Sequence, residues 1–156
     1  MTSVDLLKVI VELLNFYLSW ILGKLLLNEE KALVTDTLHK VRSLEDIDEK
    51  QVAVAFLNTY TFALSETLGR SYVGGVLTFE PGEMRKIRIP MQMADQLDLQ
   101  KIYAWQRQGE IDKVLEYTDS ILLRKGLNLT EHEIELLHSI WKKMFDRRMS
   151  RKNQKK

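Results

Sequence analysis

Glycine and proline, the residues that most restrict regular secondary structure, are rare in this chain and concentrated in one stretch. Three of the seven glycines lie in "GRSYVGG" at 69–75, and Pro81, Gly82 and Pro90 follow; there are no other prolines in the 156 residues. Glycine permits positive φ and close approach of a backbone or ligand, whereas proline interrupts helices and sheets. We therefore expect turns and short strands within 69–90.

The most apolar stretch, "VDLLKVIVELLNFYLSWILGKLLL" at 4–27, has the length of a long helix, with Ser3 as a plausible N-cap. Apolar residues run almost all the way round it, so such a helix is buried, packs against a partner or enters a membrane. Glu12 and Lys24 lie within it, and charge inside a membrane is costly. This favours a buried or self-associating helix over a membrane anchor.

The rest of the chain predicts alternating short elements and then helices. Asp48 followed by Gln51 resembles a capping box, and Thr130 with Glu133 forms another. The expected elements are a strand at 33–41, a helix at 49–69 ending at Gly69, a strand at 76–80, a short helix at 81–87, an extended "RIP" at 88–90, and helices at 92–108, 110–125 and 131–150. The predicted fold is α+β and mostly helical, with a long N-terminal helix, short strands around a Gly-rich loop, and C-terminal helices.

The last helix carries an apolar stripe at helical spacing, which favours a core face over a cofactor site: Ile134, Leu137, Trp141, Met144 and Phe145. The run at 142–156 follows with eight Lys/Arg and one Asp. It is either a solvated helix end or a non-specific phosphate clamp. Lys/Arg outnumber Asp/Glu by five after residue 69, whereas residues 1–69 have a net charge of −4. This asymmetry indicates an anionic partner for the second part of the chain.

Several kinds of chemistry have no support in the residues. Cysteine is absent, which excludes disulfides, thiolate zinc sites and a cysteine nucleophile, and fits a reducing cytoplasm. No phosphate-binding glycine motif or metalloprotease motif occurs. His132 and His138 are six residues apart and would not share a helix face, so exposed histidines are the better interpretation, and His39 stands alone. No catalytic residue and no metal site is predicted.

The glycine-flanked loop itself has two interpretations. Arg70 can fork onto a phosphate or a guanine edge, Ser71 can donate to a phosphate, and Tyr72 offers a stacking face. Alternatively the segment is a tight turn, with Arg70 on a nearby carbonyl and Tyr72 in the core. The loop alone favours the turn.

The longer stretch at 33–90 resembles the C-terminal, target-recognition side of adenine-specific DNA methyltransferases of prokaryotic type II restriction–modification systems. The resemblance covers roughly residues 30–95. Val73 departs from it, because the family usually has glycine there. The matching residues are Leu57, Asn58, Thr59, Gly69, Arg70, Ser71, Tyr72, Gly74, Gly75, Val76, Glu80, Pro81, Ile89 and Pro90.

The residues predict an apolar helix at 1–29, a helical segment at 96–150 and a basic tail at 151–156, and the resemblance adds a target-recognition-like segment at 30–95. The resemblance implies that duplex DNA is the partner, and that residues 4–27 could also contact a catalytic domain. Combined with the basic residues nearby, it gives the expected DNA-binding set: Arg70, Ser71, Tyr72, Gly74, Gly75, Arg85, Lys86 and Arg88.

The family's catalytic Asn-Pro-Pro-Tyr/Phe motif and its S-adenosylmethionine loop do not occur in the 156 residues. The expectation is therefore a DNA-binding C-terminal fragment that binds no cofactor itself, with S-adenosylmethionine used only by a full-length relative. Two alternatives remain open from the residues: a helical protein-interaction module and a membrane-associated protein, both without a nucleic-acid role.

Overall fold

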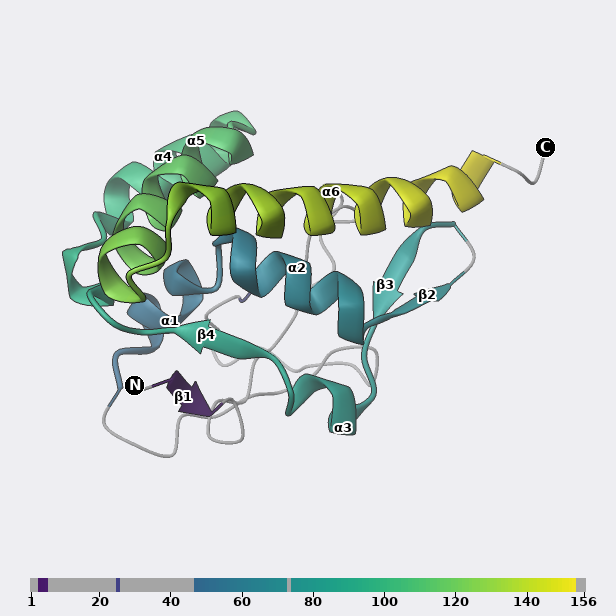
Figure 1. Ribbon diagram of the computed structural model, residues 1–156, viewed down its shortest axis with the longest axis horizontal. Helices are drawn as coiled ribbons and strands as arrows, with labels where there is room; N and C mark the ends of the chain where they lie inside the picture. The colour runs from purple at the N-terminus through teal and green to yellow at the C-terminus, as the bar shows by residue number, and fades with distance from the viewer. Residues whose placement is uncertain (1–2, 6–24, 26–46, 73, 154–156) are drawn as a thin grey trace.

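The computed structural model of the chain describes residues 3–5, 25, 47–72 and 74–153. Within these ranges helices predominate, and the short strands form two antiparallel pairs, as the mostly helical α+β expectation requires (Figure 1). The elements in chain order are β1 (Ser3–Asp5), α1 (Glu49–Ala55), α2 (Thr59–Leu68), β2 (Arg70–Tyr72), β3 (Val76–Thr78), α3 (Pro81–Met84), β4 (Arg88–Pro90), the 3₁₀ turn η2 (Ala94–Gln96), α4 (Leu99–Gln108), α5 (Ile111–Thr118), the π-helical segment η3 (Asp119–Gly126) and α6 (Glu131–Asn153).

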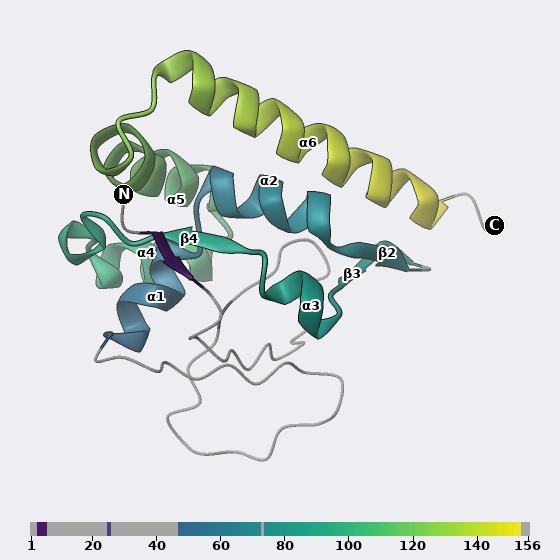
Figure 2. The ribbon, with the colours of Figure 1, turned by 60° about the horizontal axis from the view of Figure 1, so that its bottom comes forward.

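Helices α2 and α6 lie side by side and set the long direction of the fold (Figures 1 and 2). Phe62 of α2 packs against Trp141 of α6 with ring centroids 5.6 Å apart, and Trp141 also contacts Phe145. Ile134 and Trp141 are buried. The apolar stripe of the last helix is therefore core, as its spacing predicts, and it joins α6 to the residues before the hairpin.

The prediction of a single helix at 49–69 is wrong. The chain forms two helices there, α1 and α2, and the break between them lies at Asn58. The Asn58 side chain is fully buried. Its Oδ1 accepts from Thr61 N at 2.9 Å, and its Nδ2 donates to Ala55 O at 2.6 Å. The amide thus caps the start of α2 and satisfies a carbonyl at the end of α1, which stabilises a helix boundary at a point where apolar periodicity alone shows none.

The C-terminal helices lie close to their predicted positions, with two differences. Helix α4 begins at Leu99 rather than 92, because Asp98 Oδ1 accepts from Lys101 N and caps it there. Helix α5 continues into η3, where the backbone widens to π-helical geometry. Gly126 ends η3 against another segment: a Cβ at this position would lie 2.8 Å from Gln92 O. The predicted capping box of α6 is present, with Glu133 N donating to Thr130 Oγ1 at 3.3 Å.

The N-terminal expectation is wrong where the structure describes it. Residues Ser3–Asp5 form strand β1, and Ser3 pairs with Pro90 of β4. Strand pairing therefore replaces the helix start that Ser3 was expected to cap, because tertiary pairing overrides a local capping signal. The rest of the predicted helix at 4–27 and the predicted strand at 33–41 lie outside the described residues, apart from Leu25, which is buried.

Self-association through 4–27 accordingly stays a prediction, and the described residues do not test the less favoured membrane alternative for the same segment. Among the helices that the structure describes, none has the length and apolar character needed to cross a membrane.

Candidate nucleic-acid interface

Strands β2 and β3 form a hairpin, and its turn explains two of the three glycines of the loop. Gly74 and Gly75 have φ values of 83° and 75°, in the left-handed region that favours glycine, and Gly75 N donates to Tyr72 O at 3.2 Å. Gly69 differs: its φ is −73°, and a Cβ there would lie 2.6 Å from Leu77 Cδ1. Gly74 and Gly75 therefore form the turn, and Gly69 allows the hairpin to pack closely on the end of α2.

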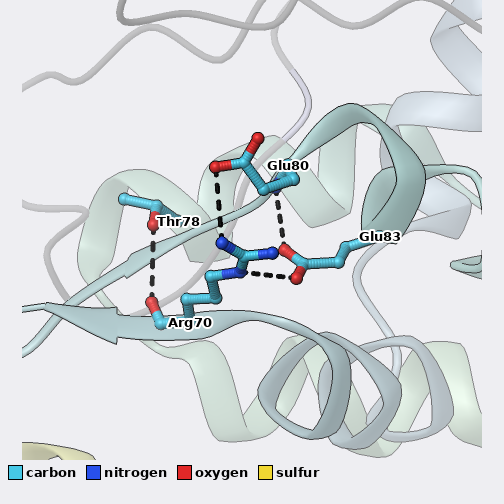
Figure 3. A network of polar contacts seen from close by, with 4 residues as sticks. All are labelled: Arg70, Thr78, Glu80 and Glu83. Carbon is cyan, nitrogen blue, oxygen red and sulfur yellow. Dashed lines mark hydrogen bonds and ion pairs between the residues drawn. The ribbon is translucent and has the colours of Figure 1, made fainter.

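Arg70 at the base of the hairpin is tied to α3 rather than to a carbonyl. Its Nε donates to Glu83 Oε1 at 2.7 Å, and its Nη1 lies 3.6 Å from Glu80 Oε1 (Figure 3). Glu83 also accepts from Glu80 N at 2.8 Å, and this bond together with Arg70 lowers the pKa of the Glu83 carboxyl. Hydrogen bonding and attraction from Glu83 raise the pKa of Arg70 in turn. The positive charge of Arg70 is thus balanced locally by two carboxylates.

Side chains alternate along a strand, so the three polar residues of β2 do not face one way. Ser71 lines a cleft on the side of α6, whereas Arg70 and Tyr72 lie on the other face. The tyrosine is 55% exposed, so the interpretation that placed Tyr72 in the core is wrong. The hairpin therefore presents an aromatic ring to solvent on one face and a hydroxyl to a cleft on the other.

The other predicted DNA contacts come from the segment that follows α3. Arg85 and Lys86 are exposed directly after this helix. Arg88 is only partly exposed, and its carbonyl accepts from Thr61 Oγ1 at 3.2 Å, so β4 is tied to α2 at this point. The predicted residues thus divide into the hairpin, an exposed basic pair beside α3, and Arg88, which lies in strand β4.

A cleft of about 210 Å³ lies between the end of α2, the hairpin and the C-terminal part of α6. Both ribbon views place the hairpin beside this part of α6 (Figures 1 and 2). The residues that line it are Glu66, Thr67, Gly69, Ser71, Leu77, Met144, Arg147, Arg148 and Arg151.

Arg148 is buried and joins the three walls of this cleft. Its Nε donates to Glu66 Oε2 at 2.9 Å, its Nη2 binds the other oxygen of the same carboxylate, and its Nη1 donates to the Gly75 carbonyl in the hairpin turn. The side chains of Arg148 and Glu66 are 3% and 4% exposed. Sequence reasoning missed this pair, although position 148 continues the apolar stripe at a spacing of seven from Trp141, which marks it as an inward-facing position.

Arg147 and Arg151 are the exposed cations of the cleft. They are four residues apart, so they lie on the same side of α6. Within the described part of the chain, neither guanidinium has a carboxylate partner. The basic run at 142–156 is therefore not uniform: of the three arginines that line the cleft, Arg148 is buried and structural, and Arg147 and Arg151 are exposed.

A second polar cluster lies at the junction of α1 and α2, away from the cleft. Asp119 Oδ1 accepts from Thr59 N at 2.9 Å, and Thr118 Oγ1 donates to Leu57 O. Burial raises the pKa of Asp119 to about 6, although the Thr59 hydrogen bonds and the nearby charges of His138 and Arg124 oppose this shift. The Leu57-Asn58-Thr59 element is thus a structural junction between α2 and the α5–η3 helix.

In the ranges that the structure describes, no three His, Asp or Glu side chains are grouped so that they could hold a metal ion. His132 and His138 are exposed, as their spacing indicates, and His39 lies outside the described residues.

The comparison with protein families decides the ancestry of the chain. Residues 12–123 match the family model described as type II methyltransferase M.Eco57I, C-terminal domain. The chain belongs to this family. The matched residues of this methyltransferase C-terminal domain include the whole hairpin and the Asn58 junction. Helix α6 and its arginines lie beyond the match. No curated protein and no solved structure matched the chain.

Proposed function

We propose that this methyltransferase C-terminal domain is the DNA-binding, target-recognition part of a site-specific adenine-N6 DNA methyltransferase of a restriction–modification system. The observation that carries the proposal is the β2–β3 hairpin, which is anchored on α3 by Arg70 and exposes the Tyr72 ring beside its turn. A two-stranded β-ribbon fits the major groove of B-DNA. The glycine turn keeps the tip narrow, and the Arg70 ion pairs with Glu80 and Glu83 hold the base on α3.

In this proposal the hairpin and the basic pair after α3 have different roles. Tyr72 offers a ring and a hydroxyl to a base edge or an unstacked base. Arg85 and Lys86 position the domain on backbone phosphates, which give affinity without sequence information. Arg70 acts as the brace of the hairpin rather than as a direct contact, because its guanidinium already binds two carboxylates.

Methyl transfer belongs to a separate catalytic part in this proposal, and the chain by itself binds no S-adenosylmethionine. Calorimetric titration with the cofactor tests this point. A micromolar binding isotherm would contradict it.

The experiment for DNA binding is fluorescence anisotropy with a labelled duplex at several salt concentrations. The variant Arg85→Ala/Lys86→Ala should lower affinity and flatten the plot of log K against log salt by up to about 1.8, since each phosphate contact contributes about 0.9. Tyr72→Ala should weaken binding by about 1–3 kcal/mol, the range for loss of one stacked base, and leave the salt slope unchanged.

The matched control removes two exposed cations from elements outside the hairpin and α3, Arg107→Ala in α4 and Lys125→Ala in η3. It should retain the slope and affinity of the unchanged chain. Salt-independent or undetectable duplex binding by the unchanged chain would refute the proposed function.

A further inference from the structure

We propose that the cleft between the hairpin and α6 is a phosphate-binding site, in which Arg147 and Arg151 donate to the phosphate oxygens from one wall and the Ser71 hydroxyl donates from the other. The ligand chemistry is a phosphate group, and a DNA backbone phosphate is its source. The choice of DNA as the source rests on the proposed function. The site itself rests on the geometry of the cleft.

The charges of the cleft favour an anion. Glu66 is the one acidic residue among those that line it, and both of its oxygens already bind Arg148. The charges of Arg147 and Arg151 are therefore not balanced by a carboxylate on the cleft walls. Guanidinium groups present planar, forked donors that match phosphate oxygens, and two of them on one side of a helix can bind the same group or adjacent ones.

The buried pair beneath the cleft sets its shape in advance. Arg148 holds the Gly75 carbonyl of the hairpin turn and the Glu66 carboxylate of α2 at the same time. Such buried ion pairs add little stability compared with apolar side chains, and their best-attested use is to specify one arrangement. Here that arrangement keeps the Ser71 face of the hairpin opposite α6, so a ligand need not order the two walls.

The site is not supplied by the family match. Residues 12–123 match, so the hairpin wall comes from the family domain and the α6 wall lies beyond it. Cations near a helix C-terminus also interact favourably with the helix dipole. If that were the whole role of Arg147 and Arg151, their loss would lower the melting temperature and leave phosphate binding unchanged.

The test compares Arg147→Gln/Arg151→Gln with Lys142→Gln/Lys143→Gln, which removes two exposed charges from the same helix outside the cleft. Duplex affinity at each salt concentration is measured by anisotropy. The cleft variant should bind at least about tenfold more weakly, the lower end for loss of one charged hydrogen bond. Its salt slope should fall by about 1.8. The lysine variant should retain both values.

A charge-conserving variant, Arg147→Lys/Arg151→Lys, keeps the two positive charges and removes the forked guanidinium donors. It should retain most of the salt slope and still bind more weakly than the unchanged chain. Equal losses of duplex affinity in Arg147→Gln/Arg151→Gln and in Lys142→Gln/Lys143→Gln would overturn the proposal, because they would show general attraction of DNA to a basic helix rather than binding at a site. Melting curves for every variant show whether any loss of affinity reflects unfolding.

Titration with inorganic phosphate, followed by nuclear magnetic resonance shifts of Ser71 and Arg147, distinguishes the sources of the phosphate group. Weak phosphate binding with strong duplex dependence on the two arginines supports a DNA backbone phosphate. Tight phosphate binding with duplex affinity unchanged in the cleft variant overturns the DNA source. If the unchanged chain binds phosphate in the cleft and no duplex, the proposed function fails while the site stands.

Discussion

At the scale of single residues, the buried carboxylate of Asp119 is an unusual choice for a helix junction. It accepts a hydrogen bond from the first residue of α2, Thr59, whose backbone N–H has no partner within its own helix. Its burial nevertheless disfavours the ionised form, which is why its pKa is raised from 3.8 to about 6. Asp119 therefore orients α2, and its burial lowers the stability of the fold at pH values where the carboxyl group is ionised.

The contribution of Asp119 to stability should consequently fall as pH rises between about 4 and 6. Below this window Asp119 is protonated in both folded and unfolded chains; within it the folded chain holds the proton and the unfolded chain does not. A shift of this size corresponds to roughly 3 kcal/mol of unfolding free energy. Asp119→Asn retains an oxygen for Thr59 N and removes the titration, so it should be more stable than the unchanged chain at pH 7.

Urea unfolding at pH 4, 5, 6 and 7 measures this effect. The control is the exposed Asp112→Asn on the neighbouring helix, which should leave the pH profile as it is. An Asp119→Asn profile that matches that of the unchanged chain would contradict the assignment.

The glycines of the hairpin region allow a similarly direct comparison. Gly74 has a φ of 83°, so Gly74→Ala should destabilise the fold by about 1–2 kcal/mol, the usual cost of a left-handed residue with a Cβ. At Gly82 in α3 an added Cβ would have no atom within 4 Å, so Gly82→Ala should be neutral or stabilise by up to about 1 kcal/mol. Thermal unfolding of the two variants side by side is the measurement, and equal losses would show that the φ value does not matter.

At the scale of elements, the contact between α2, α6 and the hairpin depends on one ion pair. Arg148→Met leaves the Glu66 carboxylate buried without its partner, which should cost about 3–5 kcal/mol of stability. The double variant Glu66→Leu/Arg148→Met should recover most of this loss, because apolar pairs replace buried ion pairs well. Denaturant unfolding is the measurement, and Arg147→Met at the adjacent exposed position is the control.

The double variant should still lack the bond from Arg148 to the Gly75 carbonyl. We therefore expect faster hydrogen exchange at the amides of the β2–β3 hairpin than in the unchanged chain, even where global stability is recovered. Unchanged exchange in the double variant would show that the hairpin holds its position without the arginine.

At the scale of the whole molecule, the basic C-terminal run has a structural part and an exposed part, and truncation should separate them. A chain that ends at Arg151 keeps the buried pair and the cleft, so it should keep its melting temperature and lose duplex affinity only through its three missing lysines. A chain that ends at Asp146 loses Arg148 as well and should be destabilised by about 3–5 kcal/mol.

Calorimetric melting and anisotropy on the two truncated chains provide the comparison. If both chains melt at the same temperature as the full chain, the run is a solvated tail and the buried pair contributes nothing to the fold.

The sequence by itself determined the features that depend on neighbours along the chain. The positive φ of Gly74 and Gly75, the capping box at Thr130 and Glu133, and the helical spacing of the apolar stripe in α6 all depend on residues within one or two turns of each other. The same holds for the ordered motif that indicates the methyltransferase family, because it is itself a linear string.

The tertiary structure alone decided where separate segments meet. Arg148 and Glu66 are 82 residues apart, and Thr59 and Asp119 are 60 apart, so no local period connects them. Arg70, predicted as a DNA contact, is likewise ion-paired only because α3 brings Glu80 and Glu83 to it. A charged side chain looks the same in the sequence whether it is buried, paired or exposed, and its surroundings are set by packing between elements, which depends on the whole chain.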